Sequence, residues 1–207
     1  MQPAFSGVCK TFPPVLALLF IFLGFCGSAY SGENGDDLFD GQIRSLTQPK
    51  EPLTPSNDPR FRDNSDGTVT DLKEGLMWKK SDSYQELKKW INWAKAQDYI
   101  REMNDKRFAG YADWVLPTRE ELASLYEEDK VIPWNYYWTE NQVHMDPIFG
   151  YTSCCFWTSE TYKDEYAWHF NFIRGKSYPS LKEGQSLSLS VIRPVRKVQA
   201  GASAFNK

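Results

Sequence analysis

One apolar run near the start of the chain decides which part of it can fold as a domain. Residues 15–25 are apolar and uncharged, and this run is too short to cross a bilayer as a helix, which takes about 20 residues. Lys10 precedes the run, and the small residues Gly27 and Ala29 follow it. This order is typical of a secretory signal peptide. We therefore expect residues 1–29 to be removed and the protein to be exported, to the periplasm, the cell surface or the medium.

Two alternative interpretations of this segment, a membrane anchor and a lipoprotein signal, are disfavoured. An uncleaved membrane anchor would need a longer run, and Gly24 weakens the end of this one. In a lipoprotein, Cys26 would be acylated and would become the mature N-terminus. Phe25 fills the preceding position, where a small residue is expected, so the lipoprotein at Cys26 is the disfavoured alternative.

Loss of the signal peptide changes the charge and the cysteine content. The 24 Lys and Arg residues fall to 23 when Lys10 leaves, against 27 Asp and Glu, which gives a net charge of −4. Nucleic-acid binders carry a basic surplus, so we expect no nucleic acid as partner. Of the cysteines only Cys154 and Cys155 remain, which is not a disulfide framework.

Composition divides the mature chain into three parts. Residues 30–59 are rich in Gly, Pro and acidic residues, which predicts a disordered spacer. Residues 60–198 contain the aromatic and β-branched residues of one folded domain, long enough to bury its own core. Residues 199–207 are expected to form a flexible tail, and no transmembrane segment is expected after signal cleavage.

The first element of the domain is predicted to be a hairpin. Asp-Gly at 66–67 separates two strand-like segments, 61–63 and 68–70, and this dipeptide is a strong tight-turn signal. An EF-hand loop is the alternative. It is disfavoured because Arg62 and Lys73 would stand where its first and last carboxylate ligands are required.

Two capping boxes predict two main helices. Ser83 with Glu86 precedes apolar residues at helical spacing, which predicts a helix to about Met103. Thr118 with Glu121 predicts a second helix, whose buried stripe would contain Leu122, Leu125 and Tyr126. Residues 76–78, 168–173 and 187–191 have the patterns of short strands. The fold class is therefore predicted to be α+β, with short, mostly antiparallel strands.

Six short motifs, taken in order, resemble a known family. They are DGTVTD at 66–71, GLMW at 75–78, AGYADWVLPT at 109–118 with Glu121-Leu122, FWTS at 156–159, Ala167-Trp168 with Phe170, and RPVR at 193–196. The chain resembles the C-terminal domain of Legionella-type collagen-like adhesins (Lcl), long catalogued as a domain of unknown function. The resemblance implies a single C-type-lectin-like domain, which in the adhesins binds sulfated polysaccharides at the end of a trimer.

The chain departs from that family pattern in three respects. Val115 stands where the family usually has an arginine, and no collagen-like repeat precedes the domain. The mature chain is also acidic, which weakens the inference to sulfated ligands, because their binders need clustered cations.

Residues 114–122 also resemble formylglycine-generating enzymes, which share the lectin-like fold and hold copper with two cysteines. Cys154 and Cys155 are the only candidates, and adjacent residues of a strand point to opposite faces. The pair is either two buried thiols, the interpretation that we favour, or a vicinal disulfide. His144 and His169 have no partners at metal-ligand spacing. We therefore expect no enzyme, no metal and no cofactor, although paired catalytic carboxylates stay open.

The most distinctive local feature lies at 133–138, in a predicted long loop. Trp134, Tyr136, Tyr137 and Trp138 suit stacking on sugar faces, and the alternative is that some of them cover the core. Arg174 and Lys176 on the late hairpin are predicted to add anion contacts. Since the calcium-and-sugar motifs of true C-type lectins are absent, binding is expected to be calcium-independent.

These features together predict an exported, non-catalytic binding module. Its expected partner is an extracellular polysaccharide or another surface ligand, as for an adhesin. The alternative is a structural or protein-interaction component of a cell-envelope assembly, for which residues 30–59 would serve as a tether.

Overall fold

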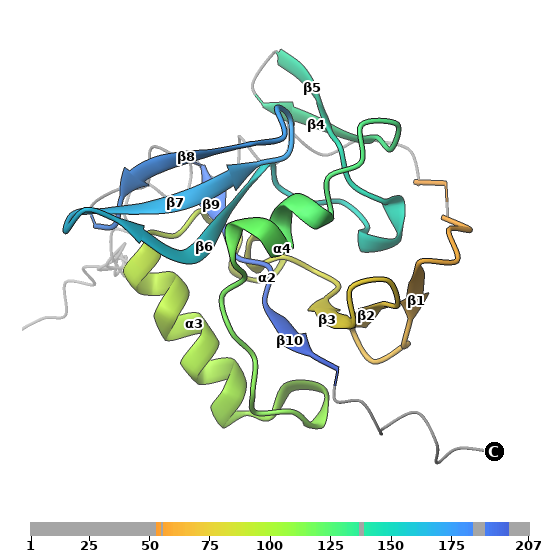
Figure 1. Cartoon of the computed structure of the whole chain (residues 1–207), viewed down its shortest axis with the longest axis horizontal. Helices are drawn as coiled ribbons and strands as arrows, with labels where there is room; N and C mark the ends of the chain where they lie inside the picture. Colours follow the sequence, from red (N-terminus) through yellow and green to blue (C-terminus); the bar gives the residue numbers. More distant parts are fainter. Residues whose placement is uncertain (1–52, 55, 137–138, 184–188, 199–207) are drawn as a thin grey trace, which may run out of the picture. The chain divides into compact units, whose positions relative to one another are not determined.

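An α+β domain with mostly antiparallel strands occupies the part of the chain that the structure describes (Figure 1). This structure is a computed structural model, and it describes residues 53–54, 56–136, 139–183 and 189–198. The predicted signal peptide, most of the predicted spacer and the predicted tail lie outside these ranges. None of the helices within them is both long and apolar enough to cross a membrane.

The elements follow one another along the chain as short segments. The strands are β1 (Phe61–Asp63), β2 (Thr68–Asp71), β3 (Leu76–Lys79), β4 (Ile132–Tyr136), β5 (Thr139–Val143), β6 (Cys155–Tyr162), β7 (Tyr166–Asn171), β8 (Lys176–Leu181), β9 (Ser190–Val191) and β10 (Val195–Lys197). The helices are α2 (Ser83–Leu87), α3 (Trp93–Asp105) and α4 (Arg119–Ser124), with the 3-10 turns η1 (Phe108–Gly110) and η2 (Pro147–Phe149). β4 and β5 form a hairpin of their own.

The first sheet holds both the first and the last strand. Its order is β1-β2-β3-β10, and all neighbours are antiparallel. The hairpin predicted around Asp-Gly is confirmed, because Phe61 pairs with Asp71 and Asp63 pairs with Val69. The short strand predicted at 76–78 is also present, as β3, and all its residues are buried.

The second sheet, of order β8-β7-β6-β9, contains the one parallel pair among the described strands, β6 with β9. Ala96 and Ile100 of α3 pack with Trp157 and Ala167 against one face of this sheet. α4 lies against β6 and β7, and Tyr126 beyond its end contacts Phe170 edge-on. Figure 1 shows both helices beside the sheet.

Aromatic side chains dominate the core. Trp78, Trp157, Phe156 and Phe172 are fully buried. Burial of each such side chain contributes about 1.5–3 kcal/mol, and their edge-on contacts, such as that between Phe156 and Phe172, add to it. The core therefore forms from hydrophobic burial, as the length of the domain predicts.

The prediction of one helix from Ser83 to about Met103 is wrong. The chain forms α2, leaves the helical path at Lys88, which is left-handed (φ 59°, ψ 24°), and resumes as α3. The described residues thus contain three α-helices where two main ones were predicted. A lysine gives no sequence signal for this conformation, which is normally taken by glycine or asparagine.

The interruption has a cause in the neighbouring sheet. The backbone N–H of Ile91 donates to the carbonyl of Ser190 (3.1 Å), and the carbonyl of Ile91 accepts from the indole Nε1 of Trp157 (2.7 Å). In a continuous helix, both this N–H and this carbonyl would form hydrogen bonds within the helix itself. Asn92 then caps α3, since its side chain accepts from the backbone N–H of Lys95.

The capping box predicted from Ser83 and Glu86 is also wrong. Asp82 is the N-cap of α2, and its Oδ1 accepts from the backbone N–H of Gln85 (3.1 Å). The Ser83 hydroxyl instead accepts from the backbone N–H of Ile192 (3.0 Å). Two adjacent residues that both suit a cap compete here, and the contact with Ile192 decides between them.

The second capping box is confirmed. The Thr118 hydroxyl accepts from the backbone N–H of Glu121 (3.1 Å), and the Glu121 carboxylate accepts from the backbone N–H of Thr118 (2.8 Å). Leu122 and Leu125 are fully buried and Tyr126 is partly buried, as the predicted stripe requires.

Ordered contacts begin before residue 60, within the predicted spacer. Ser56 donates to the carboxylate of Asp146 (2.6 Å), and the Asp58 carboxylate pairs with Lys130 (3.3 Å). These bonds fix the segment before β1 to the loops around α4 and η2.

The turn between β7 and β8 depends on a residue without a side chain. Gly175 has φ +61°, and a Cβ there would lie 2.8 Å from the Tyr126 ring. We expect Gly175→Ala to lower the free energy of unfolding by about 2–4 kcal/mol, measured by urea denaturation, because the clash adds to the cost of a positive φ. Gly75→Ala is the matched control, because Gly75 also has positive φ (+66°) but open space around it, so only about 1 kcal/mol is expected. Equal losses in both variants would contradict the clash.

Candidate functional site

The segment that carries the predicted binding residues forms a hairpin. In β4, Ile132, Trp134 and Tyr136 alternate with more polar neighbours, which suits a strand with two different faces. Trp134 pairs with Asn141 of β5, and Tyr136 pairs with Thr139. The prediction of a long loop at 133–138 is therefore wrong for residues 133–136.

The rings on one face of this hairpin continue a row of aromatic contacts. Trp134 and Tyr136 are parallel, with interplanar angle 3° and centroids 5.6 Å apart. Tyr136 meets Trp90 edge-on at 5.9 Å, and Trp90 lies 5.3 Å from Tyr84. We call Tyr84, Trp90, Trp134 and Tyr136 the aromatic row.

The aromatic row runs from the core to the surface. Tyr84 is buried, whereas the other three rings are partly exposed. Trp90 and Trp134 also pack against the main core. These rings thus cover part of the core and are also partly exposed to solvent. Tyr137 and Trp138 lie outside the described residues.

The opposite face of the hairpin borders a shallow depression of about 650 Å³. Its lining consists of Val131, Pro133, Asn135, Glu140, Asn141, Gln142, His144 and Ile173. Pro133 pairs with Gln142 and Asn135 with Glu140 across the two strands, so these side chains share one face. Apolar and uncharged polar groups are mixed here with a single carboxylate.

The predicted basic residues follow Ile173 along the chain but do not line this depression. Arg174 is exposed in the turn after Ile173, and Lys176 is exposed at the start of β8. The backbone N–H of His144 donates to the carbonyl of Phe172 (3.0 Å), which joins the end of β5 to the end of β7. The turn therefore lies close to the face of the hairpin opposite the aromatic row.

A second aromatic surface, which the sequence analysis did not single out, lies on the second sheet. Tyr162 of β6 contacts Trp168 (5.2 Å between centroids) and Tyr166 (6.5 Å) of β7. The Arg119 guanidinium lies over the Trp168 ring at 4.6 Å and pairs with Glu160. We call Tyr162, Tyr166 and Trp168 the sheet platform.

The sheet platform is open to solvent at its outer end. Tyr162 is 40% exposed, and Leu181, which pairs with Tyr166 from β8, is 55% exposed. The alternation of Tyr166 and Trp168 was visible in the sequence. A shift of register in β6 between Trp157 and Thr161 was not, and Tyr162 pairs with Tyr166 beyond that shift.

Two buried residues of opposite charge, Arg193 and Asp82, are linked through the hydroxyl of Thr152. Arg193 is fully buried and donates to the carbonyl of Lys79 (2.9 Å) and to the hydroxyl of Thr152 (2.8 Å). The Thr152 hydroxyl in turn donates to Oδ2 of Asp82 (3.0 Å), which also accepts from the backbone N–H of Ser153 (2.7 Å). Asp82 is fully buried too, so its carboxylate and Arg193 neutralise each other inside the core.

The Arg193 side chain also fills hydrophobic space. Its guanidinium lies 4.8 Å from the centre of the Phe149 ring and 5.4 Å from that of Phe156. Burial lowers the pKa of Arg193 to about 10, so the side chain still carries its charge at neutral pH. The interactions of Arg193 are consistent with a structural role.

Residues 67–196 match the family model described as the Lcl C-terminal domain, which covers more than half of the chain. The chain belongs to the Lcl C-terminal domain family. The resemblance carried by the six motifs is thereby confirmed, and no curated protein matches the chain.

The motifs of this Lcl C-terminal domain lie mainly in its interior. Trp78, Trp114, Phe156 and Trp157 are all buried. In the last motif, Arg196 pairs with Asp113 of the third motif (2.7 Å). The family pattern therefore specifies packing, and the β4–β5 hairpin lies between the third and fourth motifs.

Val115, which stands where the resemblance implies an arginine, lies at the surface. It is 50% exposed and forms an isolated bridge with Val195 of β10.

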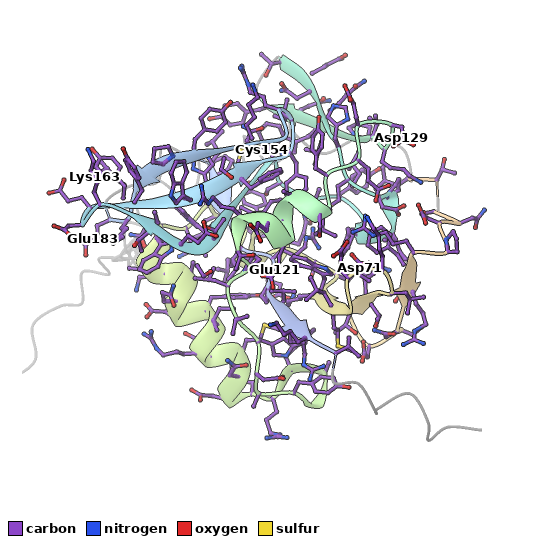
Figure 2. All side chains as sticks on the ribbon, viewed as in Figure 1. Asp71, Glu121, Asp129, Cys154, Lys163 and Glu183 are labelled. Carbon is purple, nitrogen blue, oxygen red and sulfur yellow. A yellow bond between two sulfur atoms is a disulfide. The ribbon has the colours of Figure 1, made fainter. Side chains whose placement is uncertain are left out.

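The two cysteines of the domain are joined. Cys154 and Cys155 form a disulfide between adjacent residues, where buried thiols were the favoured prediction. Both are nearly fully buried beside the start of β6, and Figure 2 shows Cys154 there, far from Lys163 at the outer tip of the β6–β7 hairpin.

The two histidines have separate surroundings. His169 is buried, its Nδ1 lies 3.0 Å from the Ser180 hydroxyl, and burial lowers its pKa to about 4. His144 is partly exposed, and its Nδ1 lies 2.9 Å from the carbonyl of Glu128. Within the ranges that the structure describes, no three His, Cys, Asp or Glu side chains converge as a metal-ligand group.

Proposed function

We propose that this member of the Lcl C-terminal domain family is an exported, non-catalytic module that binds an extracellular polysaccharide. The observation that carries the proposal is the aromatic row, in which Trp134 and Tyr136 stand parallel and partly exposed on a hairpin. Flat rings held by packing offer a sugar a large contact area with little loss of side-chain entropy.

The hairpin would hold these rings without calcium. Trp134 is fixed by the core on its inner side, and Tyr136 by its contact with Trp90. Neither position depends on a metal ligand, which supports calcium-independent binding.

A C-type-lectin-like arrangement is part of the proposal. Two features support it: the first and last strands share one sheet, and helices pack beside a second sheet. The disulfide supports a binding role over an oxidase of the formylglycine-generating type, because each sulfur of Cys154 and Cys155 is already bonded to the other.

Export would bring the domain to its ligand. The apolar run at 15–25 and the small residues after it support secretion to the periplasm, the cell surface or the medium, with a lipid-anchored form at Cys26 as the disfavoured variant.

A glycan array tests the proposed function. We expect the wild-type protein to bind at least one polysaccharide class, with unchanged binding when calcium is chelated. Trp134→Ala and Tyr136→Ala should each weaken binding about tenfold, since one stacked ring contributes on the order of 1 kcal/mol beyond its buried area. Tyr137→Ala extends the test to the next residue. Tyr111→Ala, which removes a ring outside both aromatic surfaces, is the control.

Stability measurements keep the result interpretable, because Trp134 also packs on the core. Each variant is compared at a temperature where circular dichroism shows it folded. Absence of binding to every glycan, or equal binding by wild type and both ring variants, would contradict a site at the aromatic row.

The sheet platform favours a second candidate function, a protein-interaction component of an envelope assembly. Tyr162 of β6 and Leu181 of β8 are exposed apolar groups that flank Tyr166 of β7, and such patches are common in protein interfaces. In this case Leu181→Ser with Tyr162→Ser should reduce co-sedimentation of the purified protein with isolated envelopes, while Trp134→Ala leaves it unchanged.

A further inference from the structure

The depression on the reverse face of the β4–β5 hairpin is lined by apolar and by polar side chains, which we call its apolar floor and its polar rim. Val131, Pro133 and Ile173 supply the apolar part. The rim contains Asn135, Glu140, Asn141, Gln142 and His144. Apolar surface with a few convergent polar groups is the usual composition of a small-ligand site.

Three polar side chains of this rim are free to bind a ligand. Within the described part of the chain, the side chains of Asn135, Glu140 and Gln142 make no hydrogen bond or ion pair. Asn141, by contrast, is already engaged, because its Nδ2 donates to the Thr139 carbonyl (3.3 Å) and hydroxyl (3.2 Å).

His144 adds a fourth group in a fixed orientation. Its Nδ1 is held by the carbonyl of Glu128 (2.9 Å), and its ring lies against Tyr126 at 5.5 Å. A carbonyl can only accept, so Nδ1 donates to it and Nε2 is the ring nitrogen left to contact a ligand.

The polar groups are held in place by the strands beneath them. Asn135 faces Glu140 and Pro133 faces Gln142 in register. On the other face, Trp134 packs against the core and prevents the strand from rotating. A ligand therefore meets side chains whose backbone positions are already fixed, which lowers the entropy lost on binding.

The chemistry of the rim fits a sugar ring without charge. Each amide of Asn135 and Gln142 presents a donor beside an acceptor, which suits a pair of neighbouring hydroxyl groups. The Glu140 carboxylate accepts hydrogen bonds from hydroxyls, but it repels sulfate or a uronic acid carboxylate. The apolar floor suits the C–H face of a pyranose.

We propose that this depression is a subsite for an uncharged pyranose unit of the polysaccharide. The inference rests on the proposed function and adds a preference for neutral over sulfated glycans. It differs from the sulfated ligands that the family resemblance implies.

An array in three matched sets tests this subsite. It carries neutral oligosaccharides, the same oligosaccharides after sulfation, and uronic-acid oligosaccharides. We expect wild type to bind the neutral set most strongly. The double variant Asn135→Ala/Gln142→Ala should bind it at least about tenfold more weakly, since it loses two or more hydrogen bonds. Gln97→Ala, the same change at an amide of α3, is the control and should bind as wild type.

Glu140→Gln isolates the charge. This variant keeps the shape and the acceptor of the side chain and removes the negative charge, so its preference for neutral over sulfated glycans should shrink at least about fivefold. An unchanged preference would overturn the role given to Glu140.

The outcomes separate this inference from the proposed function. Wild-type binding to sulfated glycans alone, or unchanged binding by the double variant while Trp134→Ala loses it, overturns the subsite and leaves the module a polysaccharide binder. Binding to no glycan of any set overturns the proposed function and the subsite with it.

Discussion

Asp82→Ala is expected to lower the free energy of unfolding by about 3–5 kcal/mol, because it leaves the buried Arg193 without its counter-charge. The same carboxylate caps α2 and accepts from the hydroxyl of Thr152 and the backbone N–H of Ser153. Loss of the cap alone accounts for about 1 kcal/mol of this effect. Urea denaturation followed by tryptophan fluorescence measures the change.

Two further variants separate the parts of that effect. Asp82→Asn keeps the size of the side chain and its capping oxygen while removing the charge, so a smaller loss is expected. Asp129→Ala changes an exposed carboxylate and should stay within about 0.5 kcal/mol of wild type. A loss below about 1 kcal/mol for Asp82→Ala would mean that Arg193 is neutralised elsewhere.

Acid is expected to destabilise the domain through His169. Burial lowers the pKa of this imidazole from 6.5 to about 4, so the folded protein holds it neutral while the unfolded chain protonates it below pH 6.5. The stability that the domain gains from holding His169 neutral is complete above pH 6.5 and is lost as the pH falls from 6.5 to 4. The shift corresponds to about 3 kcal/mol over that window.

His169→Phe is the matched variant for this measurement. It keeps an aromatic ring next to Trp157 and Tyr178, which the imidazole contacts at 5.8 and 6.0 Å, and it does not titrate. Carboxylates titrate equally in both proteins, so the difference between their unfolding free energies isolates His169. That difference should change by about 3 kcal/mol from pH 7 to pH 4. A constant difference would show that the folded protein accepts the proton without penalty.

Local signals in the sequence correctly predicted two features whose bonds join near neighbours, whereas the Ser83–Glu86 box failed because the Ser83 hydroxyl accepts from the backbone of Ile192. The Thr118–Glu121 box and the Asp-Gly turn close within four residues, and both are present in the structure. The long helix failed because Ile91 bonds to Ser190 and Trp157, far along the chain. A hydrogen bond between residues far apart in the sequence cannot be recognised from a local pattern.

The candidate site, too, could be predicted only in part from the sequence. The aromatic content of residues 133–136 was visible, whereas their pairing with β5 depends on strand register, which places Trp134 and Asn135 on opposite faces. Neither the depression nor the sheet platform could be predicted, because each combines side chains from separate elements. The buried Arg193 was visible only as part of a family motif.

The outermost strand of the second sheet also bears on how the protein behaves in a crowded space. β8 has β7 on one side and carries Pro179, which pairs with Trp168 and has no N–H to offer to another strand. A strand edge interrupted in this way is a poor template for the edge of a second molecule. β8 therefore contributes little to edge-to-edge association of this sheet, even at high local density.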